Sequence, residues 1–214
     1  MELVHRDLAR TNYWLGNTSA ILRRLRRNPF PLRRVLDIGC GHGAILREIK
    51  HKLNVEVIGI DLQPPAVSAC DVPIIRNNAV TDTLPHADVA ICVLMAHHLS
   101  GQEVMGLIRN VGKSCRRLII LDLVRSWVPL LLFRGFVAPF LSPINASDGC
   151  LSIERAFTAA EFRSLIRRAL RETGATWTHH VAPFRIRQIA DIFFEGTSDR
   201  KSQIHATSGG RRTS

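Results

Sequence analysis

Three glycines at alternate positions follow a short apolar run, in the sequence VLDIGCGHGA at residues 35–44. Glycine lets the backbone approach a bound ligand closely, and a helix that starts after such a loop offers N–H groups to an anionic one. A second apolar run ends at Asp61, 22 residues beyond Gly39. An acid at this spacing suits the two hydroxyls of a ribose. The pattern therefore predicts a site for a ribose-containing cofactor.

Two ligand classes fit this spacing. Gly39, Gly41 and Ala44 satisfy the G-x-G-x-x-A pattern of dinucleotide sites. With Asp37 two residues ahead, the glycines up to Gly43 also match the usual loop for S-adenosylmethionine, an acid followed by G-x-G-x-G. A carboxylate repels a pyrophosphate but attracts an ammonium group such as that of a methionine moiety. Asp37 therefore favours S-adenosylmethionine.

Two adjacent histidines, His97 and His98, stand at the expected carboxyl end of another apolar run. A neutral imidazole suits a general base near an acceptor, and we expect His98 ahead of His97 in that role. The alternative is that one ring packs under the loop and the other orients it. Asp122 either lines the cofactor edge or, as we favour, caps a strand end. His179 and His180 alternate on an edge strand, so at most one of them faces a pocket.

The elements that position these residues alternate along the chain. Short β-branched runs are separated by helical patterns or turn-rich connectors, which predicts βαβ units in an α/β fold with a Rossmann-like, doubly wound, mostly parallel sheet. Several runs are apolar on both faces, as in strands buried between two helical layers. The runs are residues 35–38, 55–61, 74–75, 89–94 and 118–124.

Near the C-terminus, Thr158 and Glu161 have the spacing of a capping box. Apolar residues then recur at helical spacing from Phe162 to Leu170, which predicts a helix with one buried face. Two β-like runs follow, residues 175–182 and 184–192, on either side of Pro183. We expect them to pair as an antiparallel hairpin at the edge of the sheet.

The chain is expected to have three parts: an N-terminal helical segment (1–34), a main domain (35–196) and a disordered basic tail (197–214). Residues 125–157 interrupt the alternation. They are apolar and proline-punctuated, so we expect an insertion or lid over the carboxyl edge of the sheet. Aromatic side chains there and near the N-terminus could roof a pocket for a flat or lipophilic acceptor. The candidate acceptor-binding residues are Tyr13, Trp14, Arg125 and Trp127.

The net charge of +11 lies mostly at the margins of the 214-residue chain. Residues 22–34 carry six arginines and no acid, and residues 197–214 add +3, whereas residues 35–196 are only +2. An arginine-rich helix end can contact nucleic acid, contact an anionic membrane, or simply form a solvated face.

Five cysteines without a C-x-x-C pair indicate reduced thiols and no zinc site. No signal sequence or spanning run is recognisable, which favours a cytoplasmic protein.

Over roughly residues 10–193 the chain resembles class I S-adenosylmethionine-dependent methyltransferases. The loop LDIGCGHG is similar to their first motif, VIGIDL to the second, and TLPHADVAICVLMAHHLS to the segment in which a fourth strand ends beside the cofactor. The N-terminal LARTNYWLGNTSAILRRL, DLVRSWVPLLLF, SDGCLSIERAFTAAEFRSL and the final FRIR resemble a bacterial subgroup, similar to ubiquinone/menaquinone-type enzymes and often found in secondary-metabolite or polyketide settings.

The resemblance implies a seven-stranded sheet with an antiparallel last strand and S-adenosylmethionine as cofactor. Many family members carry an acid after the third strand for the adenine amino group. This chain has Asn77-Asn78 there, and Asn78 is the candidate substitute. The full set of predicted cofactor-binding residues is Asp37, Gly39, Cys40, Gly41, Gly43, Asp61, Leu62, Asn78 and Leu94.

The expected activity is methyl transfer to a small phenolic, quinone-like or polyketide acceptor, with peripheral membrane contact as an option and no obligatory nucleic acid. Three alternatives remain open: an RNA or protein methyltransferase, a non-catalytic S-adenosylmethionine-binding or membrane-peripheral protein, and a dehydrogenase. Against the first, no N-P-P-Y or D-P-P-Y element follows the fourth expected strand; against the last, no Y-x-x-x-K constellation is present.

Overall fold

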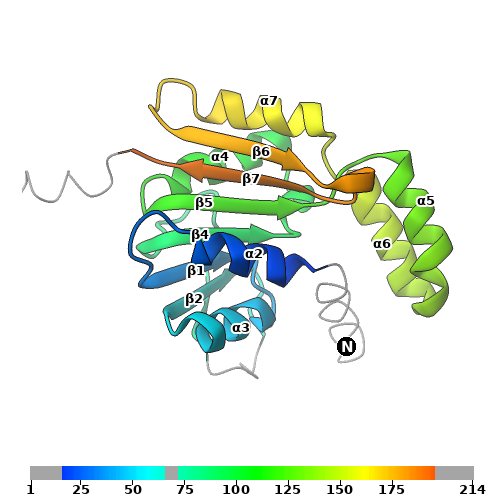
Figure 1. The fold of residues 1–214 in the computed structure, drawn as a ribbon, viewed down its shortest axis with the longest axis horizontal. Helices are drawn as coiled ribbons and strands as arrows, with labels where there is room; N and C mark the ends of the chain where they lie inside the picture. The colour runs from blue at the N-terminus through cyan, green and yellow to red at the C-terminus, as the bar shows by residue number, and fades with distance from the viewer. Residues whose placement is uncertain (1–15, 66–71, 196–214) are drawn as a thin grey trace, which may run out of the picture.

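The computed structural model describes residues 16–65 and 72–195. Within them, seven strands form one sheet in the order β3-β2-β1-β4-β5-β7-β6 (Figure 1). Strands β1 to β5 pair in parallel, β7 is antiparallel to β5, and β6 is antiparallel to β7. The predicted doubly wound sheet, its antiparallel last strand and the C-terminal hairpin are therefore confirmed. The strands are β1 (Arg34–Ile38), β2 (Glu56–Asp61), β3 (Ile74–Arg76), β4 (Ala87–Val93), β5 (Cys115–Asp122), β6 (Thr176–Val181) and β7 (Gln188–Phe193).

Helices cover both faces of the sheet, because alternate residues of its inner strands are apolar on both sides. In β5, Ile119 and Leu121 pack in the core formed with α2 and α3, whereas Leu118 and Ile120 pack in the core formed with α4 and α7. These helices are α2 (Asn17–Arg26), α3 (Ala44–Leu53), α4 (Gly101–Val111) and α7 (Ala159–Ala169).

Helix α7 begins at the predicted capping box: the Thr158 hydroxyl accepts from the Glu161 N–H, and the Glu161 side chain accepts from the Thr158 N–H. The last predicted strand begins later than expected. Pro183–Arg185 form a 3₁₀ turn in which Phe184 has a φ of 55°, and β7 starts at Gln188. The proline and the tight reversal that follows it take these residues out of the ladder.

The described part of the N-terminal segment is helix α2, whose residues Ile21, Leu22 and Leu25 are buried as expected. It is fastened to the sheet by the buried Arg117 of β5. Arg117 forms an ion pair with Asp191 of β7, and its Nη1 donates to the Arg24 carbonyl at 3.1 Å. The tail from residue 197 onward lies outside the described residues.

The predicted insertion folds as a helical hairpin, which we call the α5–α6 hairpin: α5 (Trp127–Phe136), the 3₁₀ turn η2 (Ala138–Phe140) and α6 (Pro143–Arg155). It projects beyond the carboxyl ends of the parallel strands (Figure 1). Most large apolar side chains that are exposed in the described residues lie on it, at Trp127, Leu131, Phe136, Phe140, Ile144 and Leu151.

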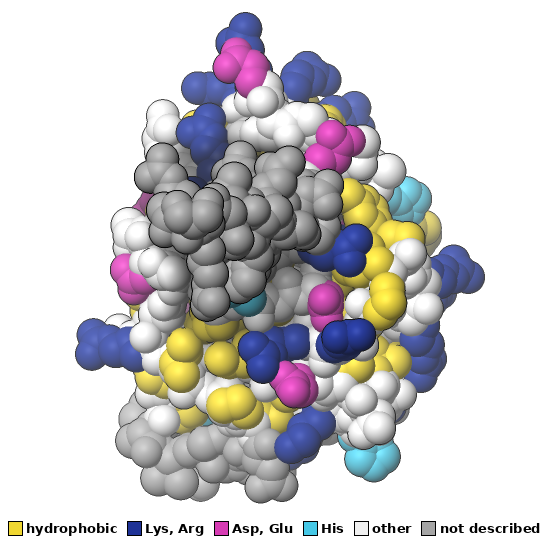
Figure 2. All heavy atoms as spheres, turned by 90° about the vertical axis from the view of Figure 1, so that its left-hand side faces the viewer, with side chains coloured by type: hydrophobic (Ala, Val, Ile, Leu, Met, Phe, Trp, Pro, Cys, Tyr) yellow, Lys and Arg dark blue, Asp and Glu magenta, His cyan; other side chains and the backbone are white. Residues whose placement is uncertain are grey.

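No helix in the described ranges is both long enough and apolar enough to cross a bilayer. At the opposite end of the molecule, Figure 2 shows basic side chains scattered among acidic and apolar ones rather than gathered in one patch. Arg34, from the arginine-rich segment, forms an ion pair with Glu56 at 2.6 Å. Part of the positive charge of that segment is thus neutralised by an acid of strand β2.

Candidate cofactor and acceptor site

The candidate site lies where the strand order reverses. Strand β1 pairs with β2 on one side and with β4 on the other, so loops from the carboxyl ends of these strands diverge there and leave room for a ligand. The predicted glycine loop follows β1, Asp61 ends β2, and His97 and His98 follow β4 in the 3₁₀ turn η1 (Ala96–His98).

The loop glycines meet two different needs. Gly39 has a φ of 69°, and a Cβ on it would lie 2.5 Å from Cγ of Met95, so the first glycine allows close packing against the segment after β4. Gly41 also has a positive φ, 53°, but a Cβ there would meet no atom of the described residues within 4 Å. The open side of Gly41 is available for a ligand, and the contact of Met95 with Gly39 brings η1 next to the loop.

Asp61 fastens this loop to the end of β2. Its Oδ2 accepts the Gly41 N–H at 2.9 Å and its Oδ1 accepts the Gln63 N–H at 2.9 Å. Each carboxylate oxygen can accept more than one hydrogen bond, so Asp61 can hold the loop and still receive the two hydroxyls of a ribose.

Asp37 is buried in β1, with 3% of its surface exposed. Burial, together with the nearby Asp61, raises the pKa of its carboxyl to about 8, although the Ile38 N–H favours the charged form. A buried acid of this kind is stabilised by a cation placed beside it. The ammonium group of S-adenosylmethionine supplies such a cation and a pyrophosphate does not, so the donor set fits the predicted cofactor.

The other predicted cofactor-binding residues differ in what they present. Cys40 turns its sulfur toward β2, where a Cβ on Gly59 would lie 2.4 Å from it, and its backbone helps to shape the loop: the Cys40 N–H donates to the Ile60 carbonyl and its carbonyl accepts the Gly43 N–H. Leu62 is exposed directly after β2. Asn78 accepts the Val80 N–H with its side-chain oxygen, so its amide nitrogen is the group that can reach a base. Leu94, after β4, has a φ of 53°, a costly conformation for a branched residue that often marks a functional site.

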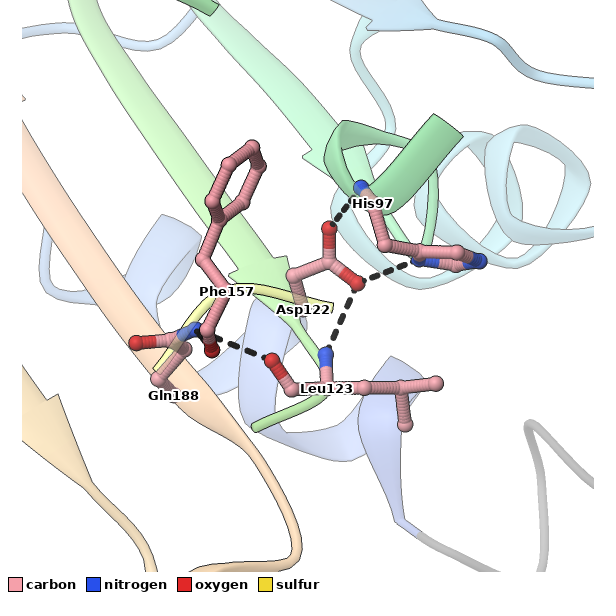
Figure 3. Close-up of polar contacts among 5 residues, drawn as sticks. All are labelled: His97, Asp122, Leu123, Phe157 and Gln188. Atoms are coloured by element: carbon pink, nitrogen blue, oxygen red, sulfur yellow. Dashed lines mark hydrogen bonds and ion pairs between the residues drawn. The ribbon is translucent and has the colours of Figure 1, made fainter. Parts of the chain in front are cut away.

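His97 and Asp122 form a buried pair at the ends of β4 and β5 (Figure 3). Nδ1 of His97 lies 2.7 Å from Oδ1 of Asp122, and the His97 backbone N–H donates to Oδ2 at 2.7 Å. The Leu123 N–H donates to Oδ1 as well. Because a carboxylate can only accept, Nδ1 carries the hydrogen in the neutral form of the ring, and Nε2 then has the lone pair and points away from Asp122.

His98 has a different environment. Its side chain is exposed, and its ring lies 4.1 Å from that of His97, centroid to centroid. Desolvation lowers the pKa of His98, and the positive charge that His97 can carry lowers it further. Our preference for His98 over His97 rested on position alone, and the hydrogen bonds favour His97. Both residues remain candidates.

One buried polar residue close to this pair escaped the sequence analysis. Gln188, 1% exposed, begins β7, and its Nε2 donates to the carbonyls of Leu123 and Phe157 at 2.9 and 3.0 Å. Figure 3 shows it beside Asp122 and Leu123. A glutamine at the start of a mostly apolar strand was the available signal. Asp122 caps the end of β5, as favoured, and orients His97 as well.

Two of the four predicted acceptor residues, Arg125 and Trp127, lie in the described part of the chain. The guanidinium of Arg125 is held by Glu161 at 2.5 Å, so the acid that caps α7 engages it. Trp127, the first residue of α5, is 71% exposed. Tyr13 and Trp14 lie outside the described residues.

The comparisons with known proteins agree with this geometry. Residues 35–117, from β1 into β5, match the family model described as a methyltransferase domain. A curated relative, indolepyruvate C-methyltransferase of Streptomyces griseus, is 32% identical over 114 residues, which cover 45% of this chain and 35% of the relative. The chain thus matches about a third of the length of that relative.

Solved methyltransferase structures share the fold. The plantazolicin methyltransferase BamL, in complex with a triazolic desmethylPZN analog and SAH, superposes with a TM-score of 0.74 at 14% identity over 91% of each chain. A putative O-methyltransferase from Nostoc punctiforme gives a TM-score of 0.57 at 16% identity, over 83% of this chain and 56% of that one. The family-model match over residues 35–117 and the shared fold make this chain similar to S-adenosylmethionine-dependent methyltransferases.

Proposed function

We propose that the protein transfers the methyl group of S-adenosylmethionine to a small, lipophilic acceptor of phenolic, quinone-like or polyketide type. The observation that carries the proposal is the His97–Asp122 dyad, an oriented imidazole next to the glycine loop. An imidazole held in one tautomer by a buried carboxylate is suited to removing a proton from an acceptor hydroxyl.

The chain's residues would divide the work as follows. Asp37 and Asp61 hold the ammonium group and the ribose, so that the methyl carbon faces the acceptor in line. When bound, S-adenosylmethionine supplies a methyl group on a sulfonium, which needs no further activation. As the acceptor oxygen forms its bond to the methyl carbon, the carbon–sulfur bond breaks and its electron pair stays on sulfur. The acceptor proton moves to Nε2 of His97, and Asp122 stabilises the imidazolium.

The acceptor class is supported by the α5–α6 hairpin, which stands at the same edge of the sheet. Helix α5 exposes Trp127, Leu131 and Phe136, and Arg134 is its only charged residue. An apolar wall of this kind fits a flat or lipophilic molecule better than an ionic one. The scattered basic side chains of Figure 2 lie at the opposite end and do not favour a nucleic-acid acceptor.

A second candidate is methylation at carbon, on an enolisable 2-oxo acid. The match to indolepyruvate C-methyltransferase favours it. The same dyad would then remove a proton from carbon instead of oxygen.

One assay separates these readings. The protein is incubated with isotopically methyl-labelled S-adenosylmethionine and a panel of phenols, quinols, indolepyruvate and azole peptides, and products are identified by mass spectrometry. We expect a labelled phenol or quinol ether, and that His97→Gln lowers kcat at least about 100-fold with the Kd for S-adenosylhomocysteine unchanged. The matched control is His180→Gln, an exposed histidine on β6, which should keep full activity. A full rate in His97→Gln would show that no base acts at this position, and a product from indolepyruvate alone would select carbon methylation.

A further inference from the structure

A single buried side chain, Gln188, joins the sheet to the root of the hairpin. Its Nε2 donates to the carbonyl of Leu123, just after β5, and to that of Phe157, just after α6. These two residues flank the α5–α6 hairpin on either side. The two segments at the base of the hairpin, residues 123–125 and Phe157, form its neck. They are joined further by the Arg125 N–H, which donates to the same Phe157 carbonyl at 3.1 Å.

The hydrogen bonds of Gln188 fix its orientation. Both hydrogens of its amide nitrogen are used by the two carbonyls, so its Oε1 must accept. The donor is Nε2 of His179 on β6, at 3.0 Å. His179 is therefore in the Nε2–H tautomer, and its Nδ1, buried with no hydrogen-bond partner, is a bare acceptor. Leaving the lone pair of His179 Nδ1 without a donor costs less free energy than burying an N–H without an acceptor. This tautomer therefore gives every N–H of the Gln188–His179 pair an acceptor.

The same backbone segment carries the dyad. Leu123 offers its carbonyl to Gln188 and its N–H to Oδ1 of Asp122, the oxygen that also faces Nδ1 of His97. The segment after β5 can thus move neither toward the hairpin nor away from the sheet without weakening a bond to Asp122. Figure 3 shows the resulting chain from Gln188 through Leu123 and Asp122 to His97.

We propose that Gln188 is a positioning residue for methyl transfer: by clasping the neck of the hairpin it holds the Leu123 segment, and through it the Asp122 carboxylate, in register with His97. The proposal rests on the proposed function, because the rate it affects is that of the base. The hydrogen bonds of the Gln188 side chain go to Leu123, Phe157 and His179, so Gln188 would act on His97 only through the Leu123 segment and Asp122.

The test is a double-mutant cycle on kcat with Gln188→Met and Asp122→Asn. Methionine keeps the length of the side chain and removes its hydrogen bonds. Alone, Gln188→Met should lower kcat about tenfold, equivalent to ~1.4 kcal/mol, with the KM for S-adenosylmethionine unchanged. In the Asp122→Asn background it should lower kcat less than about twofold, since residues that act through one another are not additive. Equal factors in both backgrounds would overturn the proposal.

Asn110 provides a matched control. It is a buried amide on α4 whose Nδ2 donates to two carbonyls, those of Ala79 and Asp82, at 2.9 and 2.8 Å. Asn110→Leu removes a comparable pair of amide-to-carbonyl bonds, so it should lower the melting temperature like Gln188→Met yet leave kcat at saturating cofactor unchanged. If Gln188→Met fails to fold, Gln188→Glu, which keeps the volume and loses at least one donor, takes its place in the cycle.

A second readout does not depend on turnover. In protein labelled with ¹⁵N-histidine, the Nδ1–H of His97 should give a slowly exchanging proton signal that is lost or exchanges at least about tenfold faster in Gln188→Met, because the bond to Asp122 opens more often. An unchanged signal contradicts the positioning role. If the wild type methylates nothing while this signal still responds, the proposed function fails and the positioning of His97 stands.

Discussion

Two buried aspartates stand at the same edge of the sheet, Asp37 in β1 and Asp122 in β5, and the protein treats them differently. Both are almost fully buried, with 3% and 2% of their surface exposed. Asp122 receives three N–H donors from the chain itself. Asp37 lies near a second acid, Asp61, and burial raises its pKa to about 8.

The difference separates the two halves of the site. Asp122 receives its hydrogen bonds from the protein itself, so it keeps its geometry when no ligand is bound. Ionising Asp37 is unfavourable while no cation lies beside it, so a cation on the ligand would stabilise its charged form. The β1–β2 half therefore depends on the cofactor for its electrostatic balance, whereas the β4–β5 half is preorganised.

Replacing Asp122 should produce the largest effect on rate. Asp122→Asn removes the charge that fixes the tautomer of His97, and we expect kcat to fall about 1,000-fold while calorimetry shows unchanged binding of S-adenosylhomocysteine. The control is Asp191→Asn, which loosens the buried ion pair with Arg117 in the neighbouring strand. It should lower stability and not kcat. A loss of cofactor binding in Asp122→Asn would mean that the two halves are not separate.

Asp61 tests the cofactor half. Asp61→Ala should weaken binding of S-adenosylhomocysteine about 100-fold, because two ribose hydroxyls lose a charged acceptor. Asp88 is a matched control at the other end of the sheet, since its carboxylate also accepts two backbone N–H groups, those of Arg33 and Arg34. Asp88→Ala removes a comparable pair of backbone bonds and should leave the affinity unchanged. Equal losses in the two variants would assign the effect to loop stability alone.

Asp37→Asn should stabilise the ligand-free protein and abolish its cofactor affinity. The pKa of Asp37 is about 8 in the folded protein against the ordinary aspartate value of 3.8, so the folded state binds more protons between these limits. The wild type therefore loses stability as the pH rises from 4 to 8, and the variant does not. Urea unfolding at pH 8 should show a gain of about 2 kcal/mol that shrinks toward pH 4. A gain independent of pH, or a loss at pH 8, contradicts the raised pKa.

The smallest effect is expected at His98. His98→Ala should change kcat less than about threefold, because the ring is exposed and makes no contact with Asp122 comparable to that of His97. A loss of kcat as large as that of His97→Gln would indicate that His98 is the general base and that the hydrogen bond from His97 to Asp122 does not select the base.

Much of the fold could be predicted because its signals are local. The glycine loop, the two-faced apolar runs and the Thr158–Glu161 capping box are each read within about ten residues, and each appears where expected. The start of β7 could not be placed, because residues 184–187 have strand-like composition and the turn that excludes them depends on the reversal after Pro183.

The acceptor half was harder to predict because its contacts are long-range. His97 and Asp122 are 25 residues apart, and Gln188 is 65 residues from Leu123. Position after the fourth strand marked both histidines and favoured His98, whereas the Asp122 carboxylate, which no local pattern reveals, contacts His97. Arg125 showed the converse: its place suggested a pocket, and the structure gives its guanidinium to Glu161.

The narrow neck of the α5–α6 hairpin also bears on how such a protein can diversify. In α5 only Pro129 is buried, and in α6 only Ile153, so the hairpin shares little of the main core. Residues 127–155 can therefore be substituted, or replaced as one segment, with little effect on the stability of the sheet or of the glycine loop. If the hairpin contacts the acceptor as proposed, changes within it would alter the range of acceptors and leave the glycine loop unchanged.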